Sequence, residues 1–141
     1  MSELSFPAQE FEGRLAKIRL KMKAAGLDAL ILTRSENIFY ASGFRATHFA
    51  SWLCELHVLV VPAEGAPRLM TRALEREIAK LQWTEAPRLY RDHDNPYEAL
   101  ADILKETGNA AKSIGIEERF LKVSQLKNIQ TRTGKTLDEP Y

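Results

Sequence analysis

The chain has 141 residues, of which 45% are hydrophobic and 28% charged, and its twenty Lys and Arg against nineteen Asp and Glu give a formal net charge of +1. This length suits one domain with one core, and the even charge balance argues against a nucleic-acid or membrane-surface binder, which concentrates basic residues. A single cysteine, Cys54, excludes an internal disulfide and, with no secretory signal or membrane-spanning run in the sequence, predicts a soluble cytoplasmic protein.

The N-terminal third predicts a helix, a buried strand and a short second helix. The apolar stripe of the first helix consists of Phe11, Leu15, Ile18 and Met22. Gly26 is suited to end this helix in a left-handed conformation. The apolar run 28–33 then predicts a buried strand, and residues 35–40 predict a helical turn that Gly43 ends.

The middle of the chain predicts a hairpin followed by a helix and a strand. Residues 57–61 and 68–71 have the composition of strands, and the turn-forming residues 62–67 connect them. Residues 74–81 predict a short charged helix, and residues 88–90 predict a strand.

The C-terminal third predicts a helix, a strand and a last helix. Asn95 is a candidate N-cap, with Pro96 at the first helical position and Glu98 completing a capping box. Residues 113–117 predict a strand, and Ser124 is a candidate cap for the last helix. The order of elements predicts a mixed β-sheet covered by helices on both faces, and leaves open whether a further strand closes it.

Three polar groupings could carry chemistry, and each has a simpler structural interpretation. Residues 92–94, Asp-His-Asp, could bind a divalent metal, but neighbours in an extended loop cannot all converge on one ion. Cys54 could be a nucleophile beside His48 or His57, but no orienting third group accompanies it, and cysteine is often a small buried hydrophobe. Residues 117–118 could be paired carboxylates, but neighbours at a strand end face opposite sides, so we expect a solvated strand end.

The segment 44–52 concentrates aromatic, basic and imidazole side chains without a regular period. It is either a surface loop whose Phe44, Phe49 and Trp52 cover the core, or an interface or ligand-facing loop, where aromatic residues and arginine are enriched. Composition favours neither interpretation.

Residues 37–44 read Asn-Ile-Phe-Tyr-Ala-Ser-Gly-Phe. This motif resembles the N-terminal domain of the pita-bread metallohydrolases, which include prolidase, aminopeptidase P and creatinase. The stretches 6–11, 26–30 and 114–117 are also similar to that family, in the same order along the chain. The resemblance covers almost the whole chain and implies an α/β domain with three layers, α/β/α, a mixed sheet and a ribonuclease H-like motif.

In this family the chemistry belongs to a second, C-terminal domain, whose two Asp, one His and two Glu hold a pair of metal ions that activate water. The resemblance therefore implies that residues 1–141 are a non-catalytic N-terminal domain, either truncated or naturally isolated, from which the catalytic domain is absent. It implies no cofactor in this chain, and two divalent metal ions (Mn, Zn or Co) in a parent hydrolase of the Xaa-Pro dipeptidase or aminopeptidase type.

The resemblance also implies roles in homo-oligomerisation, most simply as a dimer, and in substrate capping by the loop that follows the Ser-Gly-aromatic motif. Its candidates for substrate-side or interface contacts are Phe44, Arg45, His48 and Trp52. Arg45 could donate two hydrogen bonds to a carboxylate. Creatinase has a substrate-binding arginine just before the next strand, where residues 52–55 read Trp-Leu-Cys-Glu. This departure favours a peptidase over a creatinase-like C–N hydrolase, and a standalone binding or scaffold domain is a further alternative.

Overall fold

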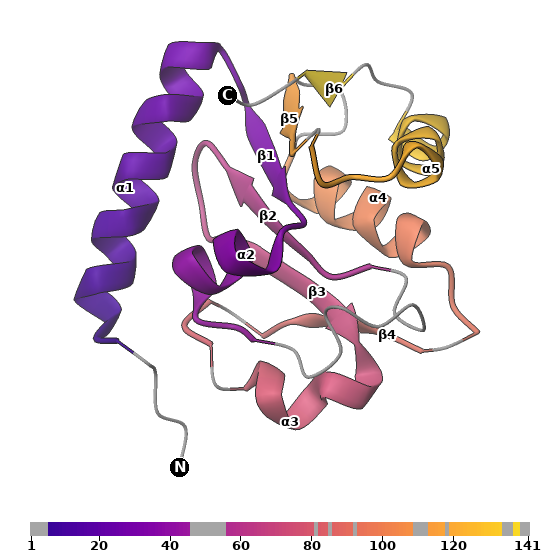
Figure 1. The fold of residues 1–141 in the computed structure, drawn as a ribbon, viewed down its shortest axis with the longest axis horizontal. Helices are drawn as coiled ribbons and strands as arrows, with labels where there is room; N and C mark the ends of the chain where they lie inside the picture. The colour runs from indigo at the N-terminus through magenta and orange to yellow at the C-terminus, as the bar shows by residue number, and fades with distance from the viewer. Residues whose placement is uncertain are drawn as a thin grey trace.

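The computed structural model describes residues 6–45, 56–80, 82–84, 86–91, 93–108, 113–117, 119–133 and 137–138. Helices alternate with short strands along the chain, apart from one hairpin (Figure 1). The elements are α1 (Ala8–Ala25), β1 (Ala29–Leu32), α2 (Ser35–Ser42), β2 (Val58–Pro62), β3 (Arg68–Arg72), the 3-10 turn η1 (Ala73–Glu75), α3 (Arg76–Ala79), β4 (Arg88–Tyr90), α4 (Pro96–Glu106), β5 (Ile114–Ile116), α5 (Val123–Thr133) and β6 (Leu137–Asp138). This order is the predicted one, with β6 as the closing strand.

The strands form one six-stranded sheet in the order β4-β3-β2-β1-β5-β6. The pairs β1–β2 and β2–β3 are antiparallel, whereas β3–β4, β1–β5 and β5–β6 are parallel, so the predicted mixed sheet is confirmed. Strand β1 lies inside the sheet, where Leu30 has Val61 of β2 on one side and Gly115 of β5 on the other.

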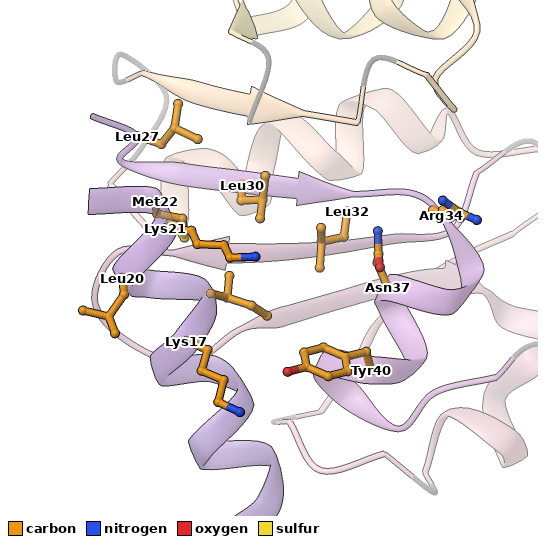
Figure 2. Close-up of a pocket in the computed structure, with 11 residues that line it drawn as sticks. Lys17, Leu20, Lys21, Met22, Leu27, Leu30, Leu32, Arg34, Asn37 and Tyr40 are labelled. Atoms are coloured by element: carbon orange, nitrogen blue, oxygen red, sulfur yellow. The ribbon is translucent and has the colours of Figure 1, made fainter. Parts of the chain in front are cut away.

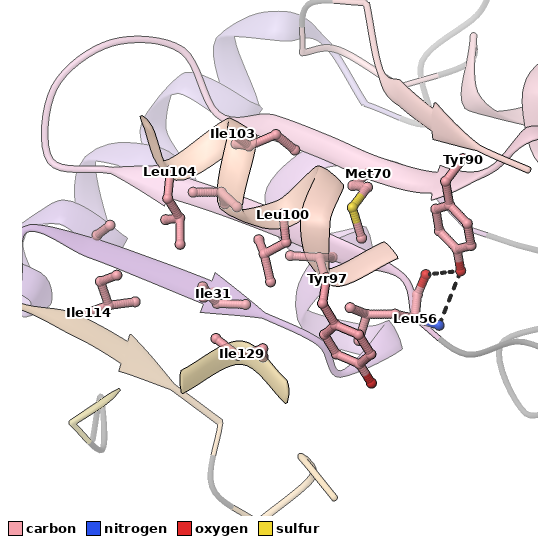
Figure 3. Packing of buried hydrophobic residues seen from close by; sticks show 13 residues of the cluster. Ile31, Leu56, Met70, Tyr90, Tyr97, Leu100, Ile103, Leu104, Ile114 and Ile129 are labelled. Atoms are coloured by element: carbon pink, nitrogen blue, oxygen red, sulfur yellow. Dashed lines mark hydrogen bonds between the residues drawn. The ribbon is translucent and has the colours of Figure 1, made fainter. Parts of the chain in front are cut away.

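Both faces of the sheet are buried under helices, as predicted. Successive side chains of a strand point to opposite faces. Leu30 and Leu32 of β1 accordingly join the apolar cluster under α1, α2 and α3. Ala29 and Ile31 join the second cluster, which contains α4 and α5 (Figure 3). The result is the expected three-layer α/β/α arrangement.

The predicted helix ends are confirmed at two glycines. Gly26 has φ 72° and follows α1, and Gly43 has φ 79° and follows α2. Glycine adopts this left-handed conformation without the steric penalty that a Cβ brings.

The predicted N-cap of α4 is confirmed, whereas that of α5 is wrong. Asn95 does cap α4, but its side chain accepts from the N–H of Tyr97 at 2.9 Å, one residue before the position that a capping box uses. Ser124 is not a cap, because α5 begins at Val123. The N–H of Lys122 instead donates to the side chain of Gln125 at 2.9 Å, which satisfies the start of that helix from inside its first turn. Among the described residues, no helix combines the length and apolar character needed to cross a membrane.

Candidate functional site

The turn after α2 is fixed by hydrogen bonds of Ser42 and by a tight contact at Gly43. The buried Ser42 hydroxyl donates to the carbonyl of Ile38 at 2.6 Å and accepts from the N–H of Phe44 at 3.1 Å. A Cβ added at Gly43 would lie 3.0 Å from the ring of Phe11. The Ser-Gly pair therefore lets α2 end against α1 while the chain turns.

Phe44 is fully buried in the core. It connects the residues just before the segment 46–55 with those just after it. Its ring centroid lies 6.1 Å from that of the buried His57, whose Nδ1 is 2.5 Å from the hydroxyl of Thr71. Residues 46–55 lie outside the described part of the chain. They include the candidates His48 and Trp52 and the cysteine Cys54. We call residues 44–45 and 56–57, on either side of this segment, its first and second stems.

The second stem is held by a tyrosine from β4. The hydroxyl of Tyr90 donates to the carbonyl of Leu56 at 2.6 Å and accepts from its N–H at 3.2 Å (Figure 3). All three groups are buried, so neither backbone group at this position lacks a partner. Sequence reasoning missed this contact, because residues 56 and 90 are far apart in the chain and meet only when the sheet has formed.

Arg45 is exposed, and it lies where the chain emerges from the core. Its guanidinium carbon lies 4.3 Å from the ring centroid of Phe39 on α2. A second arginine, Arg14 of α1, lies 4.4 Å from the ring of Phe6 and 4.6 Å from that of Tyr40, and donates to the Tyr40 carbonyl at 2.9 Å. Stacking on a ring leaves the in-plane N–H groups of a guanidinium able to bind a carboxylate.

The sequence-based interpretation of Glu117 as a solvated strand end is wrong. Its carboxylate is buried, with the residue 8% exposed, and accepts from the N–H groups of Thr33 at 2.5 Å and Arg34 at 2.8 Å. The same carboxylate accepts from the side-chain amide of Asn37. No side chain caps α2 at its own N-cap position, Arg34, and Glu117, the residue after β5, instead binds the backbone just before the helix.

The Asp-His-Asp grouping at residues 92–94 contributes to a turn through Asp94. The carboxylate of Asp94 accepts from the N–H of Arg91 at 2.9 Å, and His93 is exposed with its Nε2 3.5 Å from Asp94. Asp92 lies outside the described residues. Within the described part of the chain, no three or more His, Cys, Asp and Glu side chains gather as a metal-binding group.

Comparison with known proteins shows that the chain is similar to one part of proteins named as dipeptidases. It is 32% identical over 110 residues to the probable dipeptidase PepE of Mycobacterium tuberculosis (strain ATCC 25618 / H37Rv), a match that covers 74% of this chain and 28% of PepE. It is 25% identical over 122 residues to the putative dipeptidase YkvY of Bacillus subtilis (strain 168), covering 86% of this chain and 32% of YkvY. The chain thus spans about a third of the length of these relatives.

A solved structure matches the domain over nearly its full length. The creatinase/prolidase N-terminal domain of an X-Pro dipeptidase from Streptococcus pyogenes is 25% identical, with a TM-score of 0.75, and the match covers 90% of this chain and 98% of that one. This likeness confirms the predicted fold class. The model of the Creatinase/Prolidase N-terminal domain family matches residues 14–138. The chain therefore belongs to the Creatinase/Prolidase N-terminal domain family.

Proposed function

We propose that this chain is the non-catalytic N-terminal domain of a Xaa-Pro dipeptidase-type dinuclear metallohydrolase, in which it serves oligomerisation and substrate capping. Its likeness to the N-terminal domain of an X-Pro dipeptidase supports this proposal. So does its match to about a third of relatives that are named as dipeptidases. The two divalent metal ions, Mn, Zn or Co, then belong to a catalytic domain outside this chain, where they would activate water. We place the parent protein in the cytoplasm.

The substrate-capping proposal rests on the exposed Arg45, which directly follows the buried Phe44. The Ser42–Phe44 hydrogen bond and the burial of Phe44 fix the direction in which the chain leaves the core. Phe39 supports one face of the Arg45 guanidinium. A side chain held this way loses less conformational freedom on binding, and its fork of N–H donors matches the carboxylate of a dipeptide. We propose that His48 and Trp52 join this contact, with Phe44 as the anchor of the loop.

Arg45→Ala tests this assignment in two settings, the 141-residue chain and a full-length protein that carries this domain. In the chain, we expect the free energy of unfolding to fall by less than about 1 kcal/mol, because the side chain is exposed and contributes one surface cation–π contact. In the full-length protein, we expect kcat/KM for a Xaa-Pro dipeptide to fall ten- to a hundredfold, which corresponds to roughly 1.5–3 kcal/mol for one charged hydrogen bond. Metal content should not change.

Arg76→Ala is the matched control, because Arg76 is an exposed arginine on α3 and is not a candidate for substrate contact. It should leave both measurements unchanged. If Arg45→Ala destabilises the chain but leaves turnover normal in folded full-length protein, the residue is structural and the capping assignment is wrong. Turnover of creatine in place of Xaa-Pro dipeptides would instead assign the parent to C–N hydrolysis.

A further inference from the structure

Each carbonyl in the last turn of α2 has a hydrogen-bond partner, and most of these partners come from elsewhere in the fold. An α-helix leaves its last four carbonyls without a donor from within the helix. In α2 these carbonyls belong to residues 39–42. The carbonyl of Phe39 accepts from the N–H of Gly43 at 2.8 Å, and that of Tyr40 accepts from Arg14 of α1 at 2.9 Å. The Tyr40 side chain also points from α2 toward α1 (Figure 2).

Trp83, which follows α3 in the chain, supplies the donors for the last two carbonyls. Its indole Nε1–H donates to the carbonyl of Ala41 at 2.6 Å. Its backbone N–H donates to the carbonyl of Ser42 at 3.0 Å. One distant residue therefore satisfies both carbonyls at the point where the chain leaves the helix.

The Trp83 ring supports the same turn through Phe11. The two rings are stacked, with their centroids 5.8 Å apart and their planes at 11°. The Phe11 ring in turn lies against Gly43, where an added Cβ would be 3.0 Å from it. Trp83 is also partly buried against the apolar cluster under α1, α2 and α3. Its hydrogen bonds are thus made by a side chain whose position is restricted by packing.

These contacts set the direction in which the chain leaves α2. Because the terminal carbonyls are already bound, the N–H groups of the following residues are not needed to satisfy them. The chain turns at Gly43, buries Phe44 and then reaches the exposed Arg45. The Arg45 guanidinium carbon lies 4.3 Å from the ring centroid of Phe39, in the same last turn of α2. Both the backbone and the guanidinium of Arg45 therefore depend on the turn that Trp83 holds.

We propose that Trp83 is a positioning residue for Arg45, which holds the end of α2 so that the Arg45 guanidinium meets the carboxylate of a dipeptide. This inference rests on the substrate contact that we propose for Arg45. Trp83 need not touch the substrate, since it acts through the carbonyls of Ala41 and Ser42. A charged hydrogen bond depends on distance and direction, so a displaced guanidinium loses much of its effect. Loss of the indole N–H should therefore weaken substrate binding although no group that contacts the substrate is removed.

Trp83→Phe tests the proposal, because it keeps an aromatic ring beside Phe11 and removes the indole N–H. The kinetics are measured with a Xaa-Pro dipeptide in a full-length protein that carries this domain, with and without Arg45→Ala. With Arg45 present, we expect KM to rise roughly three- to tenfold and kcat to stay within about twofold, as for the loss of a binding contact. With Arg45→Ala present, Trp83→Phe should change KM by less than about twofold, because residues that act through one another are not additive.

Thr107→Val is the matched control. The Thr107 hydroxyl donates to the carbonyls of Ile103 at 2.9 Å and Leu104 at 3.2 Å, so it also supplies a donor to the last turn of a helix. That helix, α4, packs in the other apolar cluster, on the opposite face of the sheet from α2. Thr107→Val should leave KM within about twofold in both backgrounds. Circular dichroism confirms that each variant is folded, and if Trp83→Phe is not, Trp83→Tyr, which also lacks the indole N–H, replaces it in the same comparison.

The outcomes separate this inference from the proposed function. If Arg45→Ala alone leaves kcat/KM unchanged, the substrate contact is wrong and the positioning role fails with it. If Arg45→Ala lowers kcat/KM while Trp83→Phe changes nothing, the contact stands and Trp83 has no positioning role. A loss from Trp83→Phe that is equal in the two backgrounds, or that Thr107→Val also causes, would be a general structural effect and would overturn the positioning role as well.

Discussion

The carboxylate of Glu117 accepts a hydrogen bond from the side-chain amide of Asn37, which joins two positions eighty residues apart in the chain. The same carboxylate accepts from the backbone N–H groups of Thr33 and Arg34, just before α2. The start of a helix has unpaired N–H groups and a partial positive charge, which a buried carboxylate satisfies. Glu117 thereby fastens α2, and with it the turn that leads to Arg45, to the end of β5.

Glu117→Gln should lower the free energy of unfolding by roughly 1.5–3 kcal/mol, because the hydrogen bonds to a charged acceptor become bonds to a neutral amide. Urea unfolding followed by circular dichroism measures this change. Glu12→Gln, at an exposed position of α1, is the control and should change stability by less than about 0.5 kcal/mol. Equal effects of the two substitutions would show that Glu117 contributes no special stability.

Two glycine-to-alanine substitutions should change the stability of the chain in opposite directions. Gly43→Ala should destabilise the chain by about 1–3 kcal/mol, because φ is 79° and the new Cβ would lie 3.0 Å from the ring of Phe11. Gly13→Ala lies inside α1 with nothing within 4 Å of the added Cβ, and should stabilise by about 0.5–1 kcal/mol. Thermal melts of both variants give the comparison. A stabilising Gly43→Ala would mean that the turn after α2 adopts another conformation.

Tyr90→Phe should cost about 1–3 kcal/mol of stability, because it leaves the buried N–H and carbonyl of Leu56 without their partner. Tyr40→Phe, at a tyrosine that is 38% exposed, should cost less than about 0.5 kcal/mol. Chemical denaturation at neutral pH measures both. A Tyr90→Phe variant as stable as the Tyr40→Phe variant would contradict the assigned role of the hydroxyl.

Glu106 should contribute a pH-dependent increment of stability. Hydrogen bonds from Arg88, and then from Arg68, lower the pKa of its carboxyl below the ordinary value of 4.5. A carboxyl whose pKa is lower in the folded state stabilises the fold above its unfolded pKa, and this stabilisation is lost as the pH falls through the folded pKa. Glu106→Gln should therefore lower the urea midpoint slightly at pH 7, and the difference from wild type should vanish as the pH falls well below 4.5.

Salt provides the control for that measurement. The three side chains lie at the surface, so about 1 M NaCl should reduce the difference between wild type and Glu106→Gln at pH 7. A difference that persists unchanged at low pH would show that Glu106 acts through packing and not through its charge.

The sequence was informative wherever a local signal determines structure. The apolar stripe of α1, the glycines at 26 and 43 and the Asn-Pro start of α4 all act within a few residues, and each appears in the structure as predicted. The alternation in β1 that sends Leu30 and Ile31 to opposite faces has the same local origin. Family resemblance then supplied the fold class, which the comparisons confirm.

Contacts between distant segments could not be predicted in this way. Glu117 follows a strand of only three residues, so its exposure depends on what β5 packs against. Its partner Asn37 belongs to another motif of the same family resemblance, and nothing in either motif indicates that the two meet. For Phe44 and Arg45, composition left open whether the segment covers the core or faces a ligand, and the structure buries Phe44 and exposes Arg45. His48 and Trp52 remain predictions.

The cap at the start of α2 also imposes an order on folding. Its acceptor is supplied by residue 117, so the first turn of α2 stays without that partner until β5 has docked beside β1. Closing so long a stretch of chain has an entropic cost, which the contacts that it forms must offset. The hydrogen bonds that hold the start of α2 thus depend on the distant half of the domain, whereas the turn that leads to Arg45 is held locally by Ser42.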